Sequence, residues 1–185
     1  MARDAQATRE RLVSAARQAF SRGGFEGTTV RSIAADAGVT PALINRYFGG
    51  KEQLFAEAVA IDLAFPDLSE VDRSHLGVTL AEHFFRRWEG RQGDDLLRVL
   101  IRTAATNRDA ALRIRTILTD QVGPMVERVA GPARARERAA LIATQILGLA
   151  YGRYVVGLSD HDLPHATVLA MVGGTIQRYL VDKLP

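Results

Sequence analysis

The sequence of 185 residues contains no cysteine. Disulfides, thiolate metal sites and cysteine nucleophiles are therefore excluded. Long hydrophobic runs are also missing, because the longest, Ile146–Val156, contains two glycines and an arginine and is shorter than the ~20 apolar residues that span a membrane. The first residues lead into a polar helix without the apolar core of a signal peptide. We expect a soluble cytoplasmic protein with no membrane partner.

Sequence signatures of enzymes are missing as well. The chain has no Walker loop, nucleophile elbow or dinucleotide fingerprint. His161 and His165 lie four residues apart beside two aspartates, which superficially suits a metal ion. Pro164 lies between them, however, and indicates a solvated turn at the start of a helix. We predict that the protein is not an enzyme and has neither a metal nor another cofactor.

Residues 28–48 are the most informative segment, because they predict two short helices joined by a tight turn. Apolar residues recur at i, i+3, i+4 and i+7 over residues 30–37, which marks one face of a helix. Gly38 supplies the left-handed residue that ends this helix. Thr40 is placed to cap a second helix, and Pro41 suits its first position. This pattern is typical of a helix-turn-helix motif, whose second helix enters the major groove of DNA.

Positive charge is concentrated around this motif. Residues 1–51 contain eight Lys/Arg and four acidic residues, a net charge of +4. Residues 52–185 contain sixteen Lys/Arg and seventeen acidic residues, a net charge of −1. A basic N-terminal quarter is the expected footprint of phosphate binding.

The rest of the chain predicts helices almost without interruption and no strand, so the expected fold is all-α with about nine helices. We expect a three-helix, helix-turn-helix domain over residues 1–50 and a helical domain over residues 66–185, linked by a helix over residues 51–65 that Pro66 ends. A second break is expected at Gly123–Pro124.

The last two predicted helices, residues 139–156 and 166–180, are apolar on nearly every side and must be covered on every side. A central buried position within one subunit and contact with a second subunit both satisfy this requirement. Gly148 and Gly152, four residues apart, would let two helices approach closely.

The N-terminal segment resembles the DNA-binding domain of the tetracycline-repressor (TetR) family of bacterial transcription regulators. The resemblance covers about residues 8–60 and rests on Thr28–Val39, Ile44, Tyr47–Phe48 and Lys51–Leu54. The remainder is compatible with the variable regulatory domain of that family but has no motif of comparable strength. The resemblance implies a transcriptional regulator, by default a repressor, that binds a palindromic operator in double-stranded DNA as a homodimer. It also implies release by a small-molecule effector.

Several residues of the motif are suited to DNA. Thr29 and Thr40 can cap their helices and meet phosphates, and Lys51 is a point charge for another phosphate. Asn45 and Arg46 are candidates for base edges, although Arg46 fits a phosphate equally well. The family commonly has an aromatic residue at the position of Asn45, which makes an altered operator sequence plausible. The predicted DNA-contacting residues are Thr29, Arg31, Thr40, Pro41, Ala42, Leu43, Asn45, Arg46, Tyr47 and Lys51.

By the same resemblance, residues 133–157 and 163–183 form the dimer interface. The predicted interface residues are Leu141, Gln145, Gly148, Gly152, Val168, Val172, Ile176 and Tyr179. The middle helices would enclose a largely apolar effector pocket. Its predicted lining is His83, Phe84, Trp88, Met125, Tyr151 and Tyr154, together with Phe85 and Arg153, although aromatic residues at helical spacing also suit a plain core. The linking helix would transmit the effector's influence to the DNA-binding domain.

An alternative function is a helical protein-interaction module without a ligand response. It explains the C-terminal half but not the basic helix-turn-helix. A steep dependence of DNA affinity on salt concentration would separate the two, because only a DNA binder releases counterions.

Overall fold

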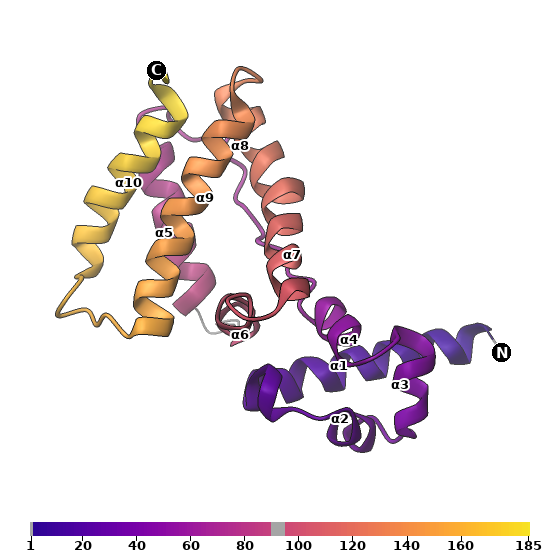
Figure 1. Ribbon diagram of the computed structural model, residues 1–185. Helices are drawn as coiled ribbons and strands as arrows, with labels where there is room; N and C mark the ends of the chain where they lie inside the picture. The colour runs from indigo at the N-terminus through magenta and orange to yellow at the C-terminus, as the bar shows by residue number, and fades with distance from the viewer. Residues whose placement is uncertain (1, 90–94) are drawn as a thin grey trace. The chain divides into compact units, whose positions relative to one another are not determined.

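The computed structural model describes residues 2–89 and 95–185, and all regular structure within them is helical (Figure 1). The all-α prediction is confirmed. The chain forms two compact units: residues 1–61 with 95–114, and residues 62–94 with 115–185. What each unit does, and therefore the predicted division into functional domains, stays a prediction.

The first unit begins with α1 (Ala2–Gly27), followed by α2 (Val30–Asp36), α3 (Pro41–Phe48) and α4 (Lys51–Ala58). α6 (Asp95–Thr103) packs against α1, and the first part of α7 (Arg108–Ile117) belongs to the same unit. α1 is interrupted at Gly24, whose φ of +67° lies in a region that favours glycine.

Three phenylalanine rings form the centre of this unit. The rings of Phe20 and Phe25 each contact Phe55 edge-on at a centroid distance of 4.9 Å. Thr28 is buried beside them, and its hydroxyl donates to the carbonyls of Ala19 and Gly24 at 3.0 and 2.7 Å. This satisfied polar group fixes the chain where α2 begins.

α4 is shorter than predicted. The apolar pattern predicted a helix to Phe65, but α4 ends at Ala58, and residues 60–68 have no regular structure. The amide of Leu63 donates to the Gln121 side chain at 2.7 Å, and Asp62 accepts a bond from the Ala64 amide. These bonds replace helical ones, so the predicted helical link extends only from Lys51 to Ala58, and its predicted continuation to Phe65 is wrong.

The second unit contains α5 (Leu76–Glu89), α8 (Gly123–Ala130), α9 (Ala135–Tyr151) and α10 (His165–Val181). α10 packs along α5 and against α9 (Figure 1). The core between these helices includes Leu80, Val126, Ile176 and Leu180. α5 and α10 cross where Gly77 meets Gly173, so closely that a Cβ on Gly77 would lie 2.2 Å from the Gly173 carbonyl oxygen.

Two π-helical turns extend these helices. η1 (Leu118–Val122) joins α7 to α8, and η2 (Gly152–Val156) prolongs α9. In η1 the amide of Gly123 donates to the Leu118 carbonyl, five residues earlier. Pro124 follows, and its ring would clash with the carbonyl four residues before it in a regular α-helix. The predicted break at Gly123–Pro124 therefore takes the form of a π-turn.

Residues 135–156 form the one described helix that is long and apolar enough to cross a membrane, with a mean hydropathy of 1.3 in its most apolar window. Only 28% of that window is buried within the chain. Length and composition alone are weak evidence, because core helices of soluble proteins share them.

Candidate DNA interface and regulatory sites

The second helix of the motif, α3, has one buried and one exposed face. Ile44 is fully buried against the unit core, so α3 is held on a rigid base. Leu43 and Tyr47 are half-buried, and the Tyr47 ring meets the Phe48 ring at a centroid distance of 6.4 Å. The exposed positions of α3 include Pro41, Ala42, Asn45 and Arg46. These four side chains are available to a partner, as the motif requires.

α2 is capped as predicted. The Thr29 hydroxyl accepts a bond from the Ser32 amide at 3.0 Å, and the Ser32 hydroxyl accepts one from the Thr29 amide at 3.2 Å. This reciprocal pair is a capping box with serine in the usual place of Glu or Gln. Gly38 has a φ of +66°, and the Val39 amide returns to the Ala34 carbonyl at 2.9 Å. The tight turn is thus closed by a left-handed glycine.

Thr40 occupies the N-cap position of α3, but its side chain makes no capping hydrogen bond. The prediction that its hydroxyl caps α3 is therefore wrong. Pro41 at the first position has no N–H to satisfy, which removes part of the need for a cap. The Thr40 side chain is exposed.

Several of the N-terminal basic residues serve the unit itself. Arg9 pairs with Glu57, and its guanidinium lies 5.1 Å from the Phe48 ring centroid. Arg17 donates to the carbonyls of Ala58 and Ala60 at the end of α4, and Arg22 pairs with Asp36 at 3.2 Å. The net charge of this segment therefore overstates the number of cations free for phosphates.

Three other cations lie on the motif or directly after it. Arg31 and Arg46 are exposed, and neither guanidinium has a side-chain partner within the described part of the chain. Lys51 is half-buried, with Nζ 4.4 Å from the Phe25 ring centroid. This cation–π contact holds Lys51 at the first turn of α4.

The predicted effector residues do not form one cavity. Trp88 stacks on Tyr154 with ring centroids 4.9 Å apart, and Phe84 packs on Trp88 at 5.6 Å. Met125 is buried and lines a separate cavity of about 400 Å³ with residues 66–69. Tyr151 is exposed. The structure thus brings five of the eight predicted residues into one cluster, which consists of Phe84, Phe85, Trp88, Arg153 and Tyr154.

Polar groups at the edge of this aromatic cluster already form hydrogen bonds or ion pairs with other residues of the chain. The Tyr154 hydroxyl donates to Glu89 at 2.7 Å, and burial, followed by its bond to Glu89, raises the Tyr154 pKa. The side chain of Arg153 is almost fully buried, pairs with Glu89 and Asp160, and donates to the Leu163 carbonyl. His83 contacts the Leu63 carbonyl through Nε2 at 2.9 Å, and burial lowers its pKa. These groups tie α5 to neighbouring segments.

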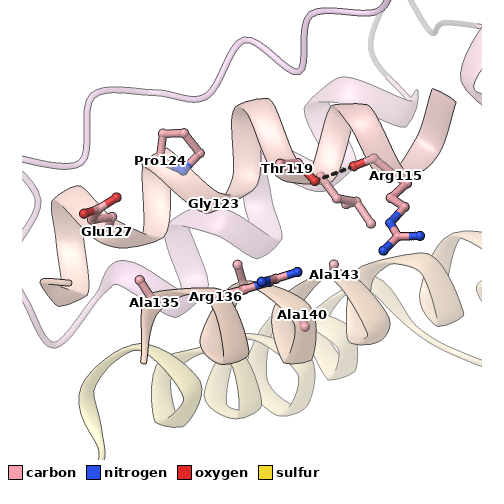
Figure 2. Close-up of a pocket in the computed structure, with 11 residues that line it drawn as sticks. Arg115, Thr119, Gly123, Pro124, Glu127, Ala135, Arg136, Ala140 and Ala143 are labelled. Atoms are coloured by element: carbon pink, nitrogen blue, oxygen red, sulfur yellow. Dashed lines mark hydrogen bonds between the residues drawn. The ribbon is translucent and has the colours of Figure 1, made fainter. Parts of the chain in front are cut away.

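A larger cavity, of about 630 Å³, was not anticipated from the sequence (Figure 2). It lies between η1–α8 and α9, with Gly123 and Pro124 on one side and four alanines of α9 on the other. Arg115, Arg136 and Glu127 also line it. Small residues at helical spacing look like ordinary packing positions in a sequence, so no sequence signal marked this cavity.

The predicted interface residues divide by burial. Val168 and Ile176 are fully buried within their own chain, where a second subunit cannot reach them. Leu141 and Gly148 are exposed, and the others are half-buried: Gln145, Gly152, Val172 and Tyr179. Met171 is the most exposed large apolar residue among those described, at 67%, and was not predicted.

The two histidines considered for a metal site lie in different environments. Ser159 donates from its amide and hydroxyl to Asp162, which closes a turn around His161. The His165 ring packs on Phe85 at a centroid distance of 3.8 Å. Over the described residues, no group of three or more His, Cys, Asp or Glu side chains is placed to hold a metal ion.

Comparison with known proteins adds to this geometry. Residues 12–58 match the family described as "Bacterial regulatory proteins, tetR family", and residues 74–180 match "Tetracyclin repressor-like, C-terminal domain". The HTH-type transcriptional repressor SCO4008 of Streptomyces coelicolor is 42% identical over 66 residues, which is 34% of each protein. The match thus spans about a third of that relative.

Two solved structures share the fold over nearly the whole chain. A transcriptional regulator from Rhodococcus sp. Rha1 has a TM-score of 0.64 and 23% identity, covering 96% of this chain and 99% of the other. The TetR-family regulator SCO0857 of Streptomyces coelicolor A3 has a TM-score of 0.54 and 26% identity, covering 94% of each chain.

Proposed function

The chain belongs to the tetR family of bacterial transcriptional regulators, and we propose that it is a cytoplasmic repressor that binds a palindromic operator as a homodimer and leaves it when a small molecule binds. The proteins it resembles are regulators and not enzymes. The observation that carries the proposal is the exposed face of α3, which bears Asn45 and Arg46, on a helix whose inner face is fixed by the buried Ile44.

For DNA, we assign the base edges to Asn45 and Arg46. An asparagine side chain pairs best with adenine, and an arginine with guanine. Thr29, Thr40 and Lys51 would meet phosphates, because they lie at the first turns of α2, α3 and α4, where backbone N–H groups also favour anions. Arg31, Pro41, Ala42, Leu43 and Tyr47 complete the proposed DNA surface.

The homodimer is supported by the apolar outer surface of α9 and α10. Leu141, Tyr151 and Met171 are 39%, 46% and 67% exposed. Large apolar side chains that are exposed on two neighbouring helices favour contact with another protein surface. A second copy would also double the base pairs that are read and match a palindrome.

For the effector, the cavity beside α9 supports a small, largely apolar molecule. Its volume of about 630 Å³ lies within the ~300–1,000 Å³ range typical of ligand sites. The aromatic cluster around Trp88 offers less room, because its rings already pack on one another. A ligand that prefers one spacing of the two α3 helices would lower DNA affinity by the coupling energy, typically ~1–3 kcal/mol.

Titration against random duplex DNA at two salt concentrations tests DNA binding, and selection from a random pool then defines the operator. We expect a steep salt dependence and a palindromic selected sequence. Affinity that does not change with salt would favour an interaction module instead. A broad metabolite panel added to the selected complex tests release, and binding that stays unchanged throughout would refute the effector part of the proposal.

A further inference from the structure

The C-terminal end of α4 is held by two arginines from other helices. Arg17 of α1 donates from Nε to the Ala58 carbonyl at 2.7 Å and from Nη2 to the Ala60 carbonyl at 2.9 Å. Arg113 of α7 donates from Nε to the carbonyl between them, that of Val59, at 3.3 Å. Two guanidinium groups therefore bind three successive carbonyls.

These contacts provide the hydrogen-bond donors and the positive charge that α4 itself lacks at its C-terminal end. The last carbonyls of a helix have no partner within it, and they form the negative end of the helix dipole. α4 has eight residues and no basic residue in its last turn. The cations that satisfy this end come from α1 and α7.

The two arginines belong to helices that are connected differently to the rest of the chain. α1 is part of the helix-turn-helix unit itself. α7 continues without a loop through η1 into α8, and its residues up to Ile114 belong to the first unit. From Arg115 onward the same continuous helical rod, which consists of α7, η1 and α8, lies in the second unit and lines the cavity beside α9. Arg113 is thus two residues away from the first residue that lines the cavity.

We infer that Arg113 is a positioning residue for DNA reading, which fixes the end of α4 to the rod that also lines the cavity. Only Gly49 and Gly50 separate α3 from α4, so the hold on α4 also limits the movement of α3. Arg113 would act through α4 and not through contact with DNA. This inference rests on the proposed function.

A positioning role predicts a loss of selectivity more than a loss of general affinity. A dimer reads two half-sites at a fixed separation, so loosening α4 weakens binding to the palindrome. Random DNA is bound mainly through phosphates, which demand less exact placement.

The test uses the full-length protein with Arg113→Gln, and with Arg108→Gln as a control in the exposed first turn of α7. The probes are a palindrome selected by the wild-type protein and a random duplex of equal length. We expect Arg113→Gln to bind the palindrome about tenfold more weakly, because part of the binding free energy must then order the released end of α4. Its affinity for the random duplex and its salt slope should match those of wild type.

Amide hydrogen exchange gives a second readout that does not depend on DNA. We expect faster exchange at Val59 and Ala60 in Arg113→Gln, with partial restoration in Arg113→Lys, which keeps the charge. If Arg113→Gln does not fold, Arg113→Lys should show a smaller loss of the same selective kind.

Wild-type affinity of the Arg113 variants for the palindrome would overturn the inference, and so would an equal loss on both probes. Failure of the wild-type protein to bind any DNA would overturn the proposed function, whereas the exchange measurement would still test the hold on α4.

Discussion

At the residue scale, Arg46 and Lys51 should affect DNA binding in different ways. Arg46 is exposed on α3, while Lys51 is held at the first turn of α4 by the Phe25 ring. We predict that Arg46→Ala costs ~1–3 kcal/mol on the selected operator and relaxes one base position. Lys51→Ala should weaken all sequences similarly and reduce the salt slope by about one. Affinities for the operator and its single-base variants, measured over a salt series, check both. An equal loss of preference in the two variants would contradict this division of roles.

His83 predicts a pH dependence of stability. Burial, with Arg86 and Arg87 nearby, lowers the pKa of His83 below 6.5, against the opposing hydrogen bond to the Leu63 carbonyl. The unfolded chain therefore binds this proton more readily than the folded chain, and acid favours unfolding. The contribution of His83 is fully present above about pH 6.5 and is lost as the pH falls through its folded pKa.

The measurement is urea unfolding between pH 7.5 and 5. His83→Gln should flatten the fall in unfolding free energy, while His161→Gln, at an exposed turn, should keep the wild-type slope. A wild-type slope in His83→Gln would show that other groups cause the acid sensitivity.

At the scale of elements, the crossing of α5 and α10 should tolerate no side chain. A Cβ on Gly77 would meet the Gly173 carbonyl oxygen at 2.2 Å and the Gln177 nitrogen at 2.6 Å. Because both atoms are backbone, the two helices must separate, and we predict that Gly77→Ala lowers the unfolding free energy by about 1–3 kcal/mol. Chemical denaturation measures this. Gly27→Ala is the control, since its added Cβ meets nothing within 4 Å. Equal stability of the two variants would refute the close crossing.

The helices of the motif were predictable because their signals are local. The capping box at Thr29, the left-handed Gly38 and the proline that opens α3 each lie within a few residues of the boundary they set. The end of α4 was not predictable, because its apolar pattern continues past Ala58. Arg17 and Arg113 donate hydrogen bonds to the carbonyls at this end, and the Gln121 side chain accepts one from the Leu63 amide just beyond it. All three residues are distant in the sequence from α4.

The candidate DNA surface was also predictable only where its signals are local in the sequence. The exposed face of α3 follows from helical periodicity around Ile44. Which cations are free does not follow from sequence, because Arg9 and Arg22 find partners only in the folded unit. The cavity beside α9 depends on how α8 and α9 pack, and alanines give no sign of it.

At the scale of the whole molecule, the exposed surface of α9 and α10 predicts self-association. Met171 projects from α10 with 67% of its surface exposed. We predict that the wild-type protein sediments as a dimer and that Met171→Glu shifts it toward monomer, because a charge buried in an apolar interface without a partner is costly. Leu112→Glu on α7, where the side chain is 48% exposed, serves as the control and should remain dimeric. Identical sedimentation of the two variants would place the interface elsewhere.

The π-turn at Leu118–Val122 gives the helical rod a phase offset. A π-turn holds one residue more than an α-turn, so every later side chain is rotated by ~100° about the axis relative to an uninterrupted helix. The pattern of inward and outward positions in α7 therefore cannot be extended into α8 by counting. Deleting a single residue there would leave a regular α-helix in which Met125 and Val126 still face the core, but it would set the ring of Pro124 against the carbonyl four residues before it. The extra residue of the π-turn therefore accommodates the proline without changing which side chains of α8 face inward.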